Sequence, residues 1–132
     1  MKRFLGFAVV LAVFSGCMSG NREGLVPVSG NVTLDGQPVE NGRILIRQQN
    51  GDQRAFGAFI VDGVYELEAL PGDCRVEIRA SRIVPGLFDN SNGVPEPRGE
   101  MYIPKRYNDQ SELTAQISTE GRNELSFELR SP

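Results

Sequence analysis

The sequence predicts an all-β protein, and three observations support that prediction. Apolar residues recur at every second position in several short stretches, most clearly between Cys74 and Ala80, where arginine and glutamate lie between them. Turn-forming pairs such as Asp62-Gly63 separate these stretches, and none has the spacing of an amphipathic helix. Because 132 residues suffice for one domain, we predict a single sandwich of seven short antiparallel strands in two sheets, as in immunoglobulin-like folds.

The predicted strands follow one another with short turns between most of them. In the first strand, every second residue from Val26 to Leu34 is apolar or glycine. The last two strands are expected to pair as a closing hairpin, and the core should combine aliphatic side chains with Phe56, Tyr65 and Phe127. The seven strands are predicted at residues 26–34, 43–48, 55–61, 64–68, 74–80, 113–118 and 124–130.

Two turns in the middle of the chain connect three successive strands. Asp62-Gly63 readily adopts the positive φ angles of a tight hairpin. In Leu70-Pro71-Gly72-Asp73, proline presets one turn angle and glycine accepts the next, so the chain can reverse into the following strand. We interpret both turns as parts of the scaffold.

The first 16 residues predict a lipoprotein signal peptide. After the cationic Lys2-Arg3, the run 4–14 is apolar but shorter than the roughly 20 residues that a membrane-spanning helix needs. Ser15-Gly16-Cys17 resembles the bacterial lipobox, in which a cysteine is acylated and becomes the new N-terminus, although Phe14 stands where leucine is usual. We therefore expect Cys17 to carry lipid and to anchor the protein in a membrane through a flexible tether, residues 17–25. The alternative is a soluble secreted protein cleaved near Gly16.

The two cysteines are not expected to form a disulfide, although disulfides are common in exported proteins. Cys17 is assigned to the lipid anchor. Cys74 is in phase with Val76 and Ile78, so we interpret it as a small buried side chain rather than a reactive thiol.

The segment 81–109 is predicted to be a long loop of the domain 26–132, and to be its binding region. Four prolines interrupt it, and loops of this length in compact domains are usually functional or disordered. Alternatively, Ile103-Pro104 and Tyr107-Asn108 only latch the segment onto the sandwich. The candidate binding residues combine charge and aromatic rings suited to a glycan or a peptide: Arg82, Phe88, Arg98, Tyr102, Lys105 and Arg106.

The composition argues against several kinds of chemistry. The absence of histidine removes the most common general base and metal ligand, so we expect neither a catalytic triad nor a zinc site, and no cofactor. Asp89-Asn90-Ser91-Asn92-Gly93 is only faintly similar to a calcium loop, and we interpret it as a turn. Paired carboxylates could hydrolyse glycosides. However, the acids lie mostly on outward phases, which indicates a solvated face at Glu66, Glu68, Glu77 and Glu128.

The charge balance also narrows the possible partners. Of the 14 basic residues, Lys2 and Arg3 belong to the signal peptide, which leaves 12 against 17 acidic residues and a formal charge of about −5. An acidic chain is not expected to bind nucleic acid or anionic lipid headgroups.

Four motifs together carry a family resemblance. They are the run 28–39, Asp62-Gly63-Val64-Tyr65, Leu70-Pro71-Gly72 and the run 103–108. The chain resembles the small lipoproteins common in Planctomycetes that are usually described as carboxypeptidase regulatory-like. Over residues 26–130, the resemblance implies a transthyretin-like or prealbumin-like sandwich with an accessory or binding role. The hydroxyisourate hydrolase branch of that fold depends on histidines, which this chain lacks.

These observations predict a non-catalytic, lipid-anchored module of the cell envelope, on the periplasmic side or at the cell surface. Its expected partner is an envelope protein or a glycan, bound through the segment 81–109. Two alternatives are an envelope hydrolase that uses paired carboxylates and a carrier of a small hydrophobic ligand. The hydrolase requires two acids that face a shared cleft, and the carrier requires an apolar cavity.

Overall fold

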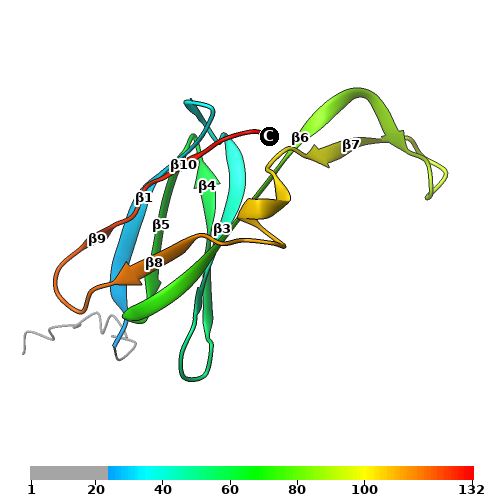
Figure 1. Cartoon of the computed structure of the whole chain (residues 1–132). Coiled ribbons are helices and arrows are strands. Elements are labelled where there is room, and N and C mark those ends of the chain that lie inside the picture. The colour runs from blue at the N-terminus through cyan, green and yellow to red at the C-terminus, as the bar shows by residue number, and fades with distance from the viewer. Residues whose placement is uncertain (1–23) are drawn as a thin grey trace, which may run out of the picture.

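The computed structural model describes residues 24–132, which fold into an all-β domain with a protruding two-stranded arm (Figure 1). Within this range, no helix is long and apolar enough to cross a membrane. The signal peptide and Cys17 lie outside the described residues. The strands are β1 (Val26–Leu34), β2 (Gln37–Pro38), β3 (Asn41–Gln48), β4 (Ala55–Val61), β5 (Val64–Ala69), β6 (Gly72–Asp89), β7 (Glu96–Met101), β8 (Thr114–Ile117), β9 (Asn123–Glu124) and β10 (Phe127–Leu129), with the 3-10 helix η1 (Lys105–Tyr107) between β7 and β8.

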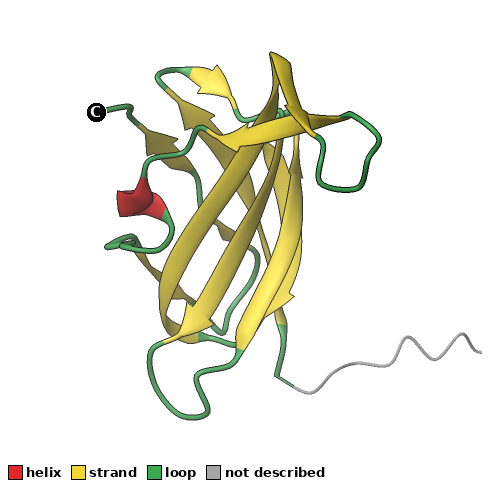
Figure 2. Ribbon diagram, turned by 90° about the vertical axis from the view of Figure 1, so that its right-hand side faces the viewer, coloured by secondary structure: helices red, strands yellow, loops and turns green. Residues whose placement is uncertain are grey.

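The strands form one curled sheet that divides into two layers. The order along the sheet is β10-β1-β5-β4-β3-β6-β7, with β2 and β9 on β1 and with β8 on β6. Between β4 and β5 the only paired residues are Val61 and Val64, beside the hairpin turn, so the sheet opens there. One layer contains β1, β5, β9 and β10, and the other contains β3, β4, β6 and β8 (Figure 2). The predicted all-β sandwich is thus confirmed.

The core lies between these layers and is formed by every second side chain of the strands. Cys74, Val76, Ile78 and Ala80 all point inward from β6, as the alternation predicts. Cys74 has no exposed surface, and burial, reinforced by the charge of Asp73, raises the pKa of its thiol. The other fully buried large apolar side chains are Tyr65, Ile44, Ile46, Ile60, Leu129, Val28, Val32 and Val39.

The predicted Asp62-Gly63 hairpin is confirmed by its backbone angles. Asp62 has a φ of 50° and Gly63 a φ of 79°, the double positive pattern of a tight turn between strands. Asp35-Gly36 repeats this pattern between β1 and β2, with φ angles of 51° and 80°. The Pro71-Gly72 turn has a different role, since it carries the chain from β5 in one layer to β6 in the other.

The expected closing hairpin between the last two strands is wrong. β8 pairs with β6 in one layer, whereas β9 and β10 lie parallel to β1 in the other. The alternation found these strands but could not choose their partners, because any strand with one apolar face fits either layer. The connection between them is closed by side-chain contacts, in which Asn123 accepts a hydrogen bond from the Ser118 amide and donates one to the Ser118 carbonyl.

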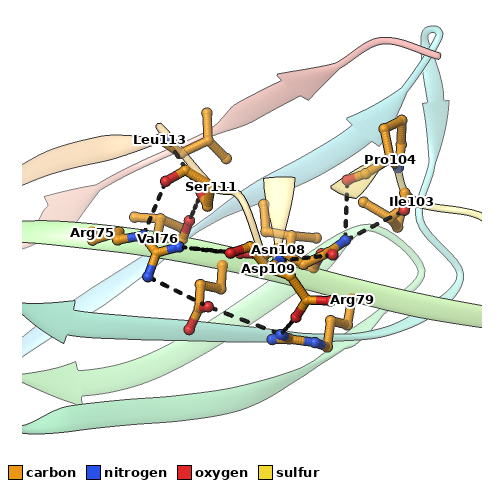
Figure 3. Close-up of polar contacts among 11 residues, drawn as sticks. Arg75, Val76, Arg79, Ile103, Pro104, Asn108, Asp109, Ser111 and Leu113 are labelled. Carbon is orange, nitrogen blue, oxygen red and sulfur yellow. Dashed lines mark hydrogen bonds and ion pairs between the residues drawn. The ribbon is translucent and has the colours of Figure 1, made fainter. Parts of the chain in front are cut away.

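The outward face of β6 is covered, contrary to the prediction of a solvated face there. Residues 103–111, which we call the clasp, lie over it (Figure 3). Arg75 Nε donates to the Ser111 carbonyl at 2.9 Å, and Arg79 pairs with Asp109 at 2.5 Å. Glu77 lies between these two arginines, at 3.7 Å from Arg75 and 3.9 Å from Arg79, and only 9% of its surface is exposed.

Asn108 holds the clasp in place. Its side-chain amide nitrogen lies 3.1–3.3 Å from the carbonyl oxygens of Ile78, Ile103 and Pro104, and its oxygen accepts from the Asp109 amide at 2.8 Å (Figure 3). Asn108 and Ile103 are buried. The alternative that this part of the chain is a latch is therefore confirmed.

The segment 81–109 is not the long irregular loop that the sequence suggested. β6 continues past the sandwich to Asp89, and β7 returns beside it from Glu96, so the two form the arm, residues 81–101. The prolines misled the prediction because a two-stranded ribbon has free edges that tolerate them. The pairing shifts register between Ile83 and Phe88, where Pro85 and Gly86 lie.

Candidate binding site at the root of the arm

The arm has two chemically different faces. Directly opposite residues of paired strands share a face, and residues two apart in a strand share it too. Ile83 is opposite Gly99, and Phe88 is opposite Pro97, which makes one face apolar. Arg82 is opposite Glu100, and Asp89 is opposite Glu96, which makes the other face charged.

A polar hollow of about 630 Å³ lies where the arm leaves the sandwich. Its wall on the sandwich side is built by the Asp62-Gly63 turn, because the Asp62 amide donates to the Glu40 carbonyl and the Gly63 amide to the Val39 carbonyl, both at 2.8 Å. Its wall on the arm side is fixed by the Tyr102 amide, which donates to the Ala80 carbonyl at 3.1 Å. The hollow is lined by Gln37, Pro38, Glu40, Asn41, Asp62, Ser81, Arg82, Ile83 and Tyr102.

Arg82 and Tyr102 lie in the wall of the hollow that the arm contributes. The guanidinium carbon of Arg82 lies 5.2 Å from the centre of the Tyr102 ring, a cation–π contact that orients both side chains. Partial burial raises the pKa of the Tyr102 hydroxyl, and the negative charge of Glu40 raises it further, while Arg82 opposes both effects. The hydroxyl therefore stays protonated at neutral pH and can both donate and accept a hydrogen bond.

The hollow brings together side chains that suit a polar ligand with an apolar face. Asn41 and Gln37 offer donors and acceptors, Glu40 and Asp62 accept, and Arg82 donates. Tyr102 adds an aromatic ring to this set. A sugar ring presents both hydroxyl groups and a C–H surface that stacks on aromatic rings, so the arrangement matches its chemistry. A volume of this size is in the range of small-molecule sites, about 300–1,000 Å³.

The structure separates the six predicted binding residues into three places. Only Arg82 and Tyr102 reach the hollow. Phe88 and Arg98 lie farther out on the arm.

Lys105 and Arg106 belong to η1 in the clasp. Arg106 stacks on Tyr107 at 4.9 Å and donates to the carbonyl groups of Arg130 and Ser131. The Tyr107 hydroxyl in turn accepts from the Arg130 amide at 3.1 Å. Arg106 and Tyr107 thus fix the C-terminal end of the chain, which assigns these two residues a structural role.

The residues that the sequence did not indicate come from the other wall of the hollow. Gln37, Glu40 and Asn41 lie in a stretch that looked like a plain connection rich in turn formers, and Asp62 looked like a hairpin residue only. These residues do form turns, but the turns also place their side chains along one rim of the hollow. The single available signal was the density of polar side chains in 37–41.

Metal binding finds no support in the part of the chain that the structure describes. Residues 24–132 contain no group of three or more histidine, cysteine, aspartate or glutamate side chains placed to hold one ion. The Asp89 turn instead satisfies its own backbone, since the Asp89 carboxylate accepts from the Ser91 amide at 2.9 Å. Hydrogen bonding from the Ser91 side chain, and then from its amide, lowers the pKa of Asp89.

Comparisons with known proteins yield only distant structural likenesses. No family model matches the chain, and no curated protein matches it. Among solved structures, a 9R-lipoxygenase from Cyanothece PCC8801 is similar, with a TM-score of 0.45 and 13% identity over 83% of this chain and 17% of the lipoxygenase. A DUF3823 family protein from Parabacteroides merdae is similar with a TM-score of 0.43 and 17% identity, over 79% of this chain and 45% of that protein. The chain thus spans less than half the length of either, and neither likeness indicates a function.

Proposed function

We propose that this protein is a non-catalytic, lipid-anchored module of the cell envelope that binds a glycan in the polar hollow at the root of the arm. The observation that carries the proposal is the Arg82–Tyr102 pair facing amide and carboxylate side chains across one hollow of about 630 Å³. Anchoring through Cys17 and kinship with the carboxypeptidase regulatory-like lipoproteins are parts of the same proposal. They rest on the lipobox-like motif and on the motifs within residues 26–130.

The position of the hollow suits a membrane-anchored protein. Val26, where β1 begins, pairs with Ala69 at the end of the sandwich where β6 starts, and the arm leaves at the other end, after Ala80. Eight residue spacings of extended chain from Gly72 to Ala80 separate the ends by about 26 Å. A tether that enters at Val26 would therefore leave the arm and the hollow facing away from the membrane (Figure 1).

Binding of envelope glycan fragments, measured by calorimetry with purified muropeptides and envelope polysaccharides, tests this proposal. Tyr102→Ala should weaken binding of the recognised fragment about tenfold or more, because it removes both the ring and its hydroxyl. Arg98→Ala, which changes the arm without touching the hollow, is the matched control and should bind normally. If no fragment binds, or if both variants bind equally well, the hollow is not the glycan site.

The expectation of an envelope protein as partner can be separated from glycan binding. Removing residues 85–100 shortens the arm but keeps every residue that lines the hollow. Glycan binding should survive this deletion, whereas a protein partner held by the arm should no longer co-purify.

A hydrolase is the second candidate, because Glu40 and Asp62 line the same hollow. Glycoside hydrolysis requires two carboxyl groups about 5–10 Å apart on either side of the bond to be broken. Slow release of shorter glycan fragments that stops in both Glu40→Gln and Asp62→Asn would favour this candidate. Unaltered fragments after long incubation would favour binding alone.

A further inference from the structure

Five of the eight large exposed apolar side chains of the described residues lie on one side of the arm and on the adjoining outer face of the sandwich. On the arm, Ile83 is 63% exposed and Phe88 is 50% exposed, and both lie on the apolar face together with Pro97. Met101 is at the base of that face, opposite Ser81, and is 43% exposed. We call these four side chains the apolar wall: Ile83, Phe88, Pro97 and Met101.

The wall continues onto the outer face of the sandwich. Val61 is opposite Asn41, and Ser81 is opposite Met101. The last pair between β3 and β6 joins Gly42 to Ala80, the residues next to Asn41 and Ser81. Val61, Asn41, Ser81 and Met101 therefore follow one another across four strands. These four residues line one shallow depression, and Phe59, Arg43 and Arg79 line it as well. Phe59 is 75% exposed and Val61 57%, and we call these two side chains the apolar floor.

The wall needs a cover for its own stability. A two-stranded ribbon is only marginally stable alone in water, because it has no layer to pack on. Every residue of β7 is exposed, as is the distal part of β6 apart from Val84. Exposed apolar patches of a few hundred Å² on a soluble domain typically mark an interaction surface.

The wall and the depression beside it have similar lengths. From Met101 to Pro97 the wall covers four residue spacings of β7, which is about 13 Å of extended chain. From Met101 to Val61 the depression crosses three spacings between strands, about 14 Å, with Ser81 and Asn41 between the two apolar ends. The arm leaves the sandwich at an angle (Figures 1 and 2). A second molecule of the same shape, related by a two-fold axis, could therefore lay its wall on this floor and receive this wall on its own floor.

We propose that the occupant of this face is a second copy of the chain, in a symmetric dimer in which each arm crosses the floor of its partner. The two phenylalanines expose about 250 Å² between them by the usual area of an aromatic side chain, and the whole face exposes roughly 500 Å². Two copies would bury on the order of 1,000 Å² of apolar surface, which with a polar rim reaches the size of a stable dimer interface, about 1,200–2,000 Å².

The dimer face borders the polar hollow, and the two share Asn41, Ser81 and Ile83. The charged face of the arm, with Arg82 and Glu100, points away from the wall. Because Arg82 and Tyr102 lie outside the wall and the floor, each proposal has variants of its own and can fail without the other.

Photocrosslinking of the whole chain, expressed with two different tags in one bacterial membrane, tests the dimer. A benzophenone amino acid that replaces Phe59 or Phe88 should produce an adduct of twice the chain mass that carries both tags. The same probe at Glu128, an exposed residue of the other layer, is the control and should produce none. Adducts only with a different protein, or no adducts from either position, would overturn the proposal.

A pair of variants distinguishes this interface from the glycan site. Phe59→Asp and Phe88→Asp place a charge in the apolar contact, and neither residue lines the hollow, so self-association of the detergent-solubilised chain, measured by sedimentation, should weaken about tenfold or more. Both side chains are exposed in the single chain, so folding should persist, as circular dichroism would show. Tyr102→Ala should sediment as the unaltered protein does. Equal sedimentation of all four proteins as monomers would refute the dimer whatever the outcome of glycan binding.

Discussion

Gly30 shows how a single position determines the packing around β1. A β-carbon at Gly30 would lie 1.8 Å from the carbonyl oxygen of Leu125, so no other residue fits there. The same carbonyl accepts a hydrogen bond of 2.6 Å from the hydroxyl of Tyr65, which is opposite Gly30 on β5. The glycine thus permits the connection from β9 to β10 to pass close to β1, and Tyr65 fixes it there.

Replacing Gly30 by alanine should destabilise the protein by about 3 kcal/mol or more, because the backbone at Leu125 has to move and the Tyr65 hydrogen bond is lost with it. Gly99→Ala is the matched control, since the nearest atom to its β-carbon is 3.5 Å away. Denaturant unfolding measures both. Equal stability of the two variants would contradict this account of β1.

The clasp contains only the single turn of η1 as regular structure, yet it covers one face of β6. Its stability depends on Asn108, whose side-chain amide is buried against three carbonyl groups, and on Ser111, whose hydroxyl donates to the Val76 carbonyl and accepts from the Leu113 amide. Buried carbonyl groups that lose their donor carry a desolvation cost of about 1–3 kcal/mol.

Asn108→Ala should therefore lower the free energy of unfolding by about 2 kcal/mol. It should also expose the amides of β6 residues 76–79 to hydrogen exchange, which a general loss of stability would not do selectively. Gln110→Ala, an exposed neighbour whose backbone bond to Lys105 is unaffected, serves as the reference. Uniformly faster exchange across all strands would show that the clasp does not protect β6 locally.

The elements differ in how well the sequence predicts them. Strands with one buried and one exposed face, such as 55–61, were found with their boundaries because alternation reports burial directly. The arm was missed because neither of its faces is buried, so no core enforces an alternation of apolar and polar residues along it. In addition, a bulge between Ile83 and Phe88 interrupts the alternation that is present. The hollow itself was not predicted. Two of the six candidate binding residues, Arg82 and Tyr102, line it, but the opposite wall depends on a contact between segments 37–41 and 62–63 that no local pattern encodes.

At the scale of the whole molecule, the C-terminal end is fastened to the first turn of the domain. The Asp35 carboxylate accepts hydrogen bonds from the Ser131 amide at 3.0 Å and from the Ser131 hydroxyl at 2.6 Å. These bonds lower the pKa of Asp35, with a smaller contribution from Arg130 and Arg106.

Because the pKa of Asp35 is lower in the folded state, the contact stabilises the fold above the usual aspartate pKa of about 3.9 and is lost as the pH falls through the lower folded value. We expect an NMR titration to place the Asp35 carboxyl below its ordinary range, and Ser131→Ala to shift it back upward. Glu128→Gln, on the adjacent strand, should leave the Asp35 titration unchanged. An ordinary aspartate titration in the unaltered protein would refute the contact.

The opposite placement of Val26 and the arm also has a mechanical consequence. If the tether and a ligand at the arm pull against each other, the load acts along β1 and β6, parallel to the strands. All the hydrogen bonds of a ladder then share the force at once, whereas a pull across the strands would break them one at a time. Such a domain should resist tension between a membrane and a cell-wall polymer better than its modest core suggests, with a lifetime under load governed by its unfolding rate.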